Sequence, residues 1–242
     1  MKLFVYHTPE SVPPGSPDCA IVVDILRATT TIATALAAGA EFVQVFASLD
    51  ELERVSNSYP IGSCLRSAER GGKKVEGYDL GNSPLDYSPD RVKGKGILLS
   101  TTNGTRALQR VSQAPQVLTA AFVNLGIITD FVRQHQPETL WIVGSGWEGS
   151  FSLEDTACAG ALVEQLSSTY QPGNDEAVAA QALYLTWQDK LEGLFHQASH
   201  GQRLLKLQGE TDLAYCAKVD LLRVVPRQQE PGILRASPFP GE

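Results

Sequence analysis

The sequence has few cysteines, and their spacing does not suit a zinc site. Its 242 residues include four cysteines, at positions 19, 64, 158 and 216, and no two of them form a C-x-x-C pair. A structural zinc site is therefore not expected. A catalytic cysteine would need a nearby histidine, and the four histidines of the chain mark no such pair. We expect all four cysteines to be buried thiols.

Basic residues are not in excess either. Lysine and arginine total 20 against 27 acidic residues, which gives a formal net charge of −7. Proteins that bind nucleic acids or anionic membranes usually carry a basic surface, so neither partner is expected. No apolar run reaches membrane-spanning length, and residues 1–5 are typical of a first strand rather than a signal peptide. We therefore expect a cytoplasmic protein.

What the chain does have is an alternation of strand-like and helical patterns. The strand-like runs lie near residues 2–6, 19–24, 42–47, 60–64, 96–100, 116–120, 139–144 and 219–225. The helical patterns between them cover about 29–39, 48–57, 104–112, 124–135 and 152–169. This alternation predicts a three-layer α/β/α fold with a mainly parallel or mixed sheet. We expect one unit over residues 1–242, either undivided or built from two closely packed lobes, about 1–135 and 136–242.

Three regions depart from the alternation. Residues 65–95 are rich in Gly, Lys, Arg and Pro, and they are predicted to form a long functional loop. Residues 174–217 are mostly helical and predict a helical C-terminal lobe. The segment from Pro226 onward is rich in Pro, Gln and Gly, and we expect it to run along the surface.

Three apolar strands each run into a small polar loop that precedes a helix. These loops begin at Asp24, Thr101 and Gly144. A strand, a Gly/Ser/Thr turn and a helix start together place backbone N–H groups around an anion. Because the carboxyl ends of parallel strands share one edge of a sheet, the three loops predict a common site for a small anionic substrate.

The first loop offers Asp24 and Arg27. A carboxylate at a strand end can hold a metal, and a guanidinium beside it can clamp a phosphate or a sulfonate. The alternative is that Asp24 caps the following helix and forms an ion pair with Arg27. Strand-end loops are where α/β sheets bind ligands, but this segment alone does not decide between the two interpretations.

The long loop offers Glu69 with Arg70, and Asn82 with Ser83. The first pair could be part of a solvated charge run that continues to Lys74, and the second could be a plain turn. The amide and hydroxyl donors of Asn82 and Ser83 would equally suit an anion.

The second and third loops carry stronger patterns. The segment Thr101-Thr102-Asn103-Gly104-Thr105 packs hydroxyls, an amide and a glycine into a strand-to-helix junction that can cradle phosphate oxygens. Simple N-capping is the alternative, and the P-loop pattern is absent. Glu154 and Asp155 follow the Gly144 loop. Paired carboxylates there suit Mg²⁺, although acidic residues also suit the first turn of a helix.

Taken together, these segments resemble the 2-phosphosulfolactate phosphatase (ComB) family over nearly the whole chain. The matching stretches are 24–30, 69–72, 77–84, 101–105, 152–155 with 158–160, 199–201 and Asp212. The resemblance implies a Mg²⁺-dependent acid phosphatase that cleaves 2-phospho-3-sulfolactate to 3-sulfolactate and phosphate, a step towards coenzyme M. One departure is Ala68, where the family pattern has a glycine; it concerns only local loop geometry.

The resulting hypothesis is a metal-dependent phosphomonoesterase. The nucleophile is a water molecule or Asp24 itself, and the lack of a D-x-D start favours water. The alternatives are a phosphatase for another small phospho-acid and a non-catalytic binder of phosphorylated or sulfonated metabolites; homo-oligomerisation is left open. The predicted catalytic residues are Asp24, Arg27, Glu69, Glu154 and Asp155; all but Arg27 are candidate Mg²⁺ ligands. The predicted substrate-binding residues are Arg70, Asn82, Ser83, Thr101, Thr102, Asn103, Gly104, Thr105 and Gly144.

Overall fold

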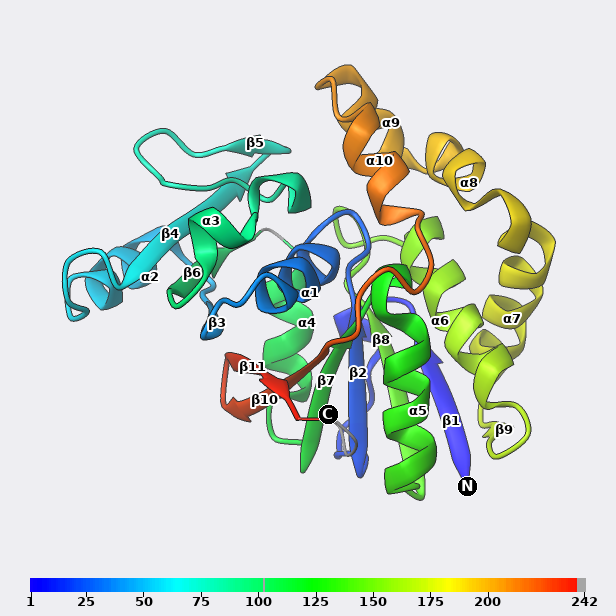
Figure 1. Cartoon of the computed structure of the whole chain (residues 1–242). Helices are drawn as coiled ribbons and strands as arrows, with labels where there is room; N and C mark the ends of the chain where they lie inside the picture. Colours follow the sequence, from blue (N-terminus) through cyan, green and yellow to red (C-terminus); the bar gives the residue numbers. More distant parts are fainter. Residues whose placement is uncertain (102, 239–242) are drawn as a thin grey trace.

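One mixed sheet runs through the protein (Figure 1). The computed structural model describes residues 1–101 and 103–238. Within these residues the strand order is β5-β4-β6-β3-β11-β10-β7-β2-β8-β1-β9. The strands are β1 Lys2–Tyr6, β2 Cys19–Val23, β3 Phe42–Val45, β4 Cys64–Arg70, β5 Lys73–Lys74, β6 Gly96–Ser100, β7 Gln116–Ala120, β8 Thr139–Gly144, β9 Gln171–Pro172, β10 Val225–Glu230 and β11 Ile233–Ser237.

Helices pack on the sheet and continue into a separate group late in the chain. They are α1 Ala28–Ala37, α2 Leu49–Ser56, α3 Pro89–Val92, α4 Gly104–Val111, α5 Leu125–His135, α6 Leu153–Leu166, α7 Asp175–Trp187, α8 Leu191–Gln197, α9 Ser199–Lys206 and α10 Glu210–Cys216. Figure 1 shows α7 to α10 following one another around one side of the sheet, with α9 and α10 beyond the ends of the central strands. The predicted α/β/α fold and the helical C-terminal lobe are confirmed.

The centre of the sheet is the parallel group β7-β2-β8-β1. Every residue of β2 is buried, as a continuous apolar run predicts for a strand covered on both faces. The strands end in register, because Val23 lies between Ala120 of β7 and Gly144 of β8. The loops that follow β2, β7 and β8 therefore leave the sheet at the same level. Strand β8 pairs with both β1 and β2, so residues before and after position 135 share this sheet.

The prediction of a long loop over 65–95 is wrong for residues 65–74, which form most of β4 and all of β5. Strand β4 pairs in parallel with β6, and β5 turns back against it. The strand predicted at 60–64 also begins too early, since β4 starts at Cys64. The reason is that β4 lies near the sheet edge and is only partly covered, so its sequence alternates charged and small residues instead of forming an apolar run.

The segment from Pro226 onward is not a surface tail. Strands β10 and β11 form an antiparallel hairpin between β7 and β3, and Leu234 of β11 is fully buried beside Val43. The strand predicted at 219–225 is also wrong, because β10 begins only at Val225. The Pro and Gln residues of β10, and the Pro and Gly residues on either side of β11, are typical of a loop, so the sequence did not indicate these strands. Residues 239–242 of the predicted tail lie outside the described residues.

The cysteines are free thiols, as expected. Cys19, Cys158 and Cys216 are buried, whereas Cys64, at the start of the partly covered β4, is only half-buried. None of the helices in the described part of the chain combines the length and the apolar character needed to cross a bilayer.

The hairpin is expected to contribute strongly to stability, because it joins β7 to β3. Leu234→Ala removes a fully buried side chain and should lower the free energy of unfolding by about 2–4 kcal/mol. The matched control is Gln229→Ala, which truncates an exposed side chain of β10 and should change it by less than about 0.5 kcal/mol. Urea unfolding measures both, and equal effects would contradict the bridging role.

Candidate active site

Asp24 is the first residue beyond β2 and is buried. Its Oδ1 accepts the N–H of Ala28, the first residue of α1, at 3.1 Å. The Thr29 hydroxyl donates to the Asp24 carbonyl oxygen at 3.0 Å. Asp24 thus supports the next helix, as one interpretation of the sequence holds. Its second carboxylate oxygen, Oδ2, points towards the start of α4, which is described below.

The Asp24 carboxyl lies in a site with a surplus of negative charge. The pKa of Asp24 is raised from 3.8 to about 6, chiefly by burial, and the carboxylates of Glu154 and Glu69 contribute to the rise. The Ala28 N–H and the His200 ring oppose the shift. An acid with this pKa can change protonation near neutral pH, or it can be held ionised by a bound cation.

Helix α4 begins directly against Asp24. A Cβ on Gly104 would lie 2.8 Å from Asp24 Oδ2 and 2.8 Å from Ala28 Cβ, so only glycine fits at this position. The close approach brings the buried residues Thr101, Asn103 and Thr105 to the same edge. Thr102, also predicted to bind substrate, lies outside the described residues.

Asp155 fastens two of the predicted loops together. Its Oδ1 accepts the Ile25 N–H at 2.8 Å, and its Oδ2 accepts the Gly146 N–H at 3.2 Å. Burial raises the pKa of Asp155 well above its usual range, and the Asp24 and Glu154 charges add to this effect. Each carboxylate oxygen thus already accepts a backbone donor, and the side chain holds the loop after β2 against the loop after β8.

Glu154 is only 2% exposed and faces a histidine from the helical lobe. His200 of α9 places Nδ1 at 3.5 Å from Glu154 Oε1. The His200 ring stacks on Trp147, with 3.8 Å between the ring centroids and 15° between the planes. Neither His200 nor Trp147 was predicted as a site residue; only the family-like Ser199-His200-Gly201 stretch pointed to this histidine.

Arg27 is paired differently from the sequence interpretation. Its Nη1 forms a buried ion pair with Asp212 Oδ2 of α10, and Nη2 donates to the Gly72 carbonyl oxygen at 3.0 Å. Asp212 Oδ1 accepts the Ser83 hydroxyl at 2.6 Å. The alternative interpretation, in which Arg27 forms an ion pair with Asp24, is therefore wrong. Asp212, which had no predicted role, joins two predicted site residues to the helical lobe.

Glu69 and Arg70 lie at the turn between β4 and β5. The Glu69 carboxylate accepts the Gly72 N–H. Arg70 is exposed, and its Nη2 donates to Ser100 Oγ at 3.0 Å, at the end of β6. The Arg70 guanidinium thus lies where the 101–105 loop begins.

Two predicted substrate-binding side chains are buried without a partner. Asn82 Oδ1 and Thr105 Oγ1 make no hydrogen bond to any described residue. The Asn82 carbonyl oxygen is fixed by the Thr31 hydroxyl at 2.9 Å, so the residue is held in place by its backbone. Buried polar atoms nearly always have partners, and an unpartnered one is a candidate for ligand contact.

Gly144 gives room for two loops to approach each other. A Cβ at this position would lie 2.7 Å from the His7 carbonyl oxygen. Glycine is therefore required at position 144 for steric reasons. The contact between Gly144 and the substrate stays a prediction.

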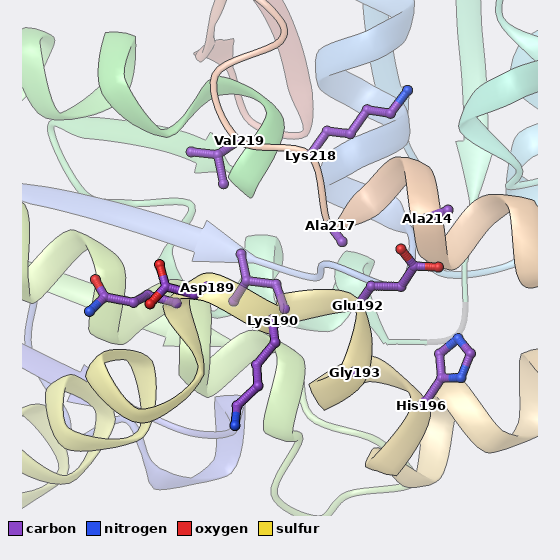
Figure 2. A pocket seen from close by; sticks show the side chains of 11 residues that line it. Asp189, Lys190, Glu192, Gly193, His196, Ala214, Ala217, Lys218 and Val219 are labelled. Carbon is purple, nitrogen blue, oxygen red and sulfur yellow. The ribbon is translucent and has the colours of Figure 1, made fainter.

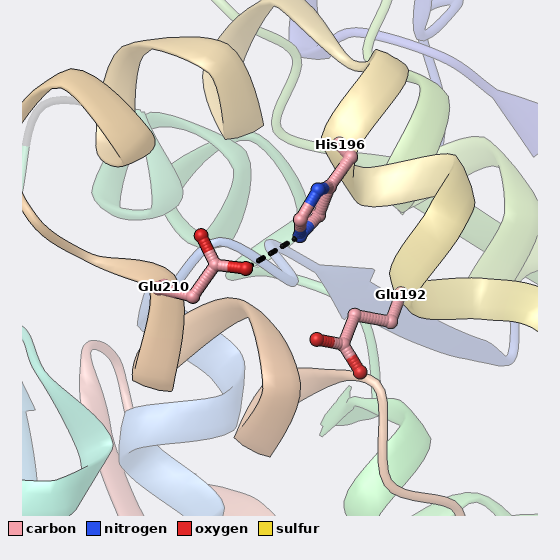
Figure 3. A group of neighbouring side chains, drawn as sticks. All are labelled: Glu192, His196 and Glu210. Atoms are coloured by element: carbon pink, nitrogen blue, oxygen red, sulfur yellow. Dashed lines mark ion pairs between the residues drawn. The ribbon is translucent and has the colours of Figure 1, made fainter.

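A compact metal cage is not found at the four predicted ligands. Within the described residues, no three of Asp24, Glu69, Glu154 and Asp155 bring ligand atoms within 4.8 Å of one another, whereas Glu192, His196 and Glu210 do (Figure 3). In that group His196 Nε2 lies 3.2 Å from Glu210 Oε1, and both glutamates are exposed. We interpret it as a surface ion pair between α8 and α10.

The groove in Figure 2 belongs to the same surface of the helical lobe. It is lined by residues 188–193, 196, 214 and 217–219. None of the predicted site residues lines it, so it is separate from the group around Asp24.

Comparison with known proteins identifies the family. The family model described as 2-phosphosulpholactate phosphatase matches residues 6–231. The chain belongs to this family. A Synechococcus sp. (strain JA-2-3B'a(2-13)) protein named "Probable 2-phosphosulfolactate phosphatase" is 61% identical over 238 residues, covering 97% of this chain and 98% of the relative. A protein of the same name from Thermosynechococcus vestitus is 59% identical, covering 97% and 99%. The resemblance read from the sequence is confirmed.

The buried Asp24 charge should destabilise the metal-free fold. Because the folded state retains the Asp24 proton up to about pH 6 and the unfolded state releases it near 3.8, stability falls as pH rises through this window. Asn retains an oxygen for the Ala28 N–H but carries no charge. In EDTA, the free energy of unfolding of Asp24→Asn, relative to that of wild type, should therefore rise by about 2–3 kcal/mol as the pH is raised from 4 to 7.

Denaturant unfolding at several pH values measures this difference. Asp189→Asn, which neutralises an exposed carboxylate of the helical lobe, is the control and should show no comparable trend. A difference between Asp24→Asn and wild type that is constant from pH 4 to pH 7 would contradict the prediction.

Proposed function

We propose that this protein is a Mg²⁺-dependent phosphomonoesterase that hydrolyses 2-phospho-3-sulfolactate to 3-sulfolactate and phosphate, in a pathway of the coenzyme M biosynthesis type. The chain belongs to a family of phosphoric monoester hydrolases. The observation that carries the proposal is the buried carboxylate pair Asp24 and Glu154. The start of α4 and two guanidinium-bearing loops lie around the same strand ends.

The residues present fit a divalent cation. Asp24, Glu154 and Asp155 are buried together, and Arg27, a nearby buried cation, is already neutralised by Asp212. Mg²⁺ commonly uses one or two carboxylates and completes its shell with water and substrate oxygens, so a cage of three close protein ligands is not required. We assign Asp24 and Glu154 as the residues that hold it, with Glu69 nearby. When bound, Mg²⁺ supplies Lewis-acid polarisation of the phosphoryl group.

The other residues bind and orient the substrate in this proposal. The backbone N–H groups at the start of α4, with the Thr105 hydroxyl and the side-chain N–H group of Asn82, hold phosphoryl oxygens. Arg70 and the remaining N–H groups of Arg27 face the carboxylate and sulfonate groups. Because a protein of net charge −7 repels a substrate with three anionic groups, the Arg70 cation and the bound Mg²⁺ would supply the positive charge. Asp212 keeps the Arg27 guanidinium and the Ser83 hydroxyl in place.

The proposed nucleophile is water. Water attacks phosphorus, the bond from phosphorus to the substrate 2-oxygen breaks, and that oxygen receives a proton to give the alcohol of 3-sulfolactate. The residues that follow Asp24 are Ile25 and Leu26, so the second acid of a D-x-D start, which would assist an aspartyl-phosphate route, is absent.

The non-catalytic alternative has less support. A binder of phosphorylated or sulfonated metabolites needs hydrogen-bond donors and cations, but it gains nothing from a buried acidic pair that would repel its ligand. A phosphatase for a different small phospho-acid would use the same carboxylates, and only the substrate distinguishes that alternative.

The metal and substrate are tested together by an assay of phosphate release. With 2-phospho-3-sulfolactate, EDTA should lower the rate at least about 100-fold and excess MgCl₂ should restore it. A panel of phospho-acids that lack the sulfonate should show lower kcat/KM, because one ionic contact is lost.

Three outcomes of this assay would contradict all or part of the proposal. Full activity in EDTA would refute the metal-assisted reaction. A higher kcat/KM for another phospho-acid would favour the second phosphatase hypothesis, and binding of phospho-acids without any phosphate release would favour the binder.

Arg70 and Lys74 provide a matched pair of exposed cations on β4 and β5. Arg70 reaches Ser100 beside the 101–105 loop, so Arg70→Ala should lower kcat/KM by roughly 10- to 100-fold. Lys74→Ala removes a screened surface charge and should change it less than about threefold. Steady-state kinetics measure both, and equal effects would remove Arg70 from the substrate site.

A further inference from the structure

Ser145 stands beside Asp24 at the carboxyl edge of the sheet. Strands β2 and β8 run in parallel, with Val23 in register with Gly144. The pairing extends one step further, because the Ser145 N–H donates to the Val23 carbonyl oxygen at 3.0 Å. Asp24 and Ser145 are thus the first residues beyond β2 and β8 and lie at the same edge of the sheet. Asp155 joins the residues that follow them, because its carboxylate accepts the N–H groups of Ile25 and Gly146.

The Ser145 hydroxyl has no partner within the described residues. The residue is 5% exposed, and its Oγ is a buried oxygen without a hydrogen bond. A buried hydroxyl ordinarily bonds to protein, water or ligand. The backbone N–H groups of Ser145 and Gly146 already donate, to the Val23 carbonyl oxygen and to Asp155. The donor left to contact a ligand at this position is therefore the Ser145 hydroxyl.

The loop holds Ser145 rigidly. A Cβ on Gly144 would lie 2.7 Å from the His7 carbonyl oxygen, and a Cβ on Gly146 would lie 2.5 Å from the Ser150 carbonyl oxygen. Both flanking residues are thus packed against backbone, which preorganises the hydroxyl between them.

We infer that the Ser145 hydroxyl donates a hydrogen bond to a non-bridging phosphoryl oxygen of the substrate. The inference rests on the proposed function, which places Mg²⁺ at Asp24 and the phosphoryl oxygens at the start of α4, next to Asp24. Gly104 at the start of α4 is close to Asp24 Oδ2, and Ser145 follows the neighbouring strand β8. The phosphoryl group is then bounded by donors from two loops. The carboxylate and sulfonate lie farther away, towards Arg27 and Arg70.

Such a donor acts more strongly on the transition state than on the bound substrate, because charge on the phosphoryl oxygens is redistributed as the ester bond breaks. Ser145→Ala should therefore lower kcat/KM roughly 10- to 100-fold, mainly through kcat. Its thermal midpoint should be unchanged or higher, because the removed oxygen has no protein partner.

The chain offers a matched control in Thr119. Its hydroxyl is also fully buried without a partner, but it lies inside β7 beside Val22, one position before the strand end. Thr119→Val should leave both kcat and KM within about twofold of wild type. Ser145→Thr, which keeps the hydroxyl, should recover most of the activity lost in Ser145→Ala.

Binding of inorganic phosphate, measured by calorimetry in the presence of Mg²⁺, provides a second readout that does not depend on turnover. Ser145→Ala should weaken it at least about fivefold, and Thr119→Val should not. If wild type releases no phosphate from 2-phospho-3-sulfolactate but this difference remains, the assigned reaction fails and the Ser145 contact stands. If Ser145→Ala keeps wild-type kinetics and phosphate affinity, or if Ser145→Thr is as impaired as Ser145→Ala, the inference is overturned.

Discussion

The parallel pairing of β2 with β7 and β8 is the constraint on which the site depends. All three strands end at one level, so Asp24 and Ser145 leave the sheet beside each other. The shared level alone would leave the loops loose. Asp155 fixes them by accepting one backbone N–H from each of the loops after β2 and β8. The strand register brings the two loops close together, and the buried Asp155 carboxylate fixes their relative position.

The helical lobe completes the site from the other side. Asp212 of α10 forms the buried ion pair with Arg27, and His200 of α9 faces Glu154. A buried arginine without its partner would be costly, so the position of α10 and the position of Arg27 are set together. The C-terminal helices therefore supply residues to the candidate site and are not an appendage to the α/β core.

The sequence was sufficient to identify the central strands and the loops that meet around Asp24, but it was insufficient for strands that are only partly buried. Cys19–Val23 is apolar throughout because both faces of β2 are covered, so periodicity identified it. β4 and the β10–β11 hairpin carry Arg, Glu, Gln and Pro, and their strand character comes from pairing with distant segments, which local patterns do not encode. Likewise Asp24 and Gly104 were recognisable from their loops. The partner of Arg27 was not, because Asp212 is brought to it only by the tertiary fold.

The hairpin position has a consequence for the order in which the chain can fold. β3 and β7 do not pair with each other; the sheet is continuous only because β11 pairs with β3 and β10 with β7. Leu234 therefore meets Val43 only after the chain has been synthesised through β11, the last strand among the described residues. Until then two groups of parallel strands present open edges, which are surfaces prone to intermolecular pairing. The fold thus combines early local βα units with one late, long-range closure, a topology of high contact order that favours slow final assembly.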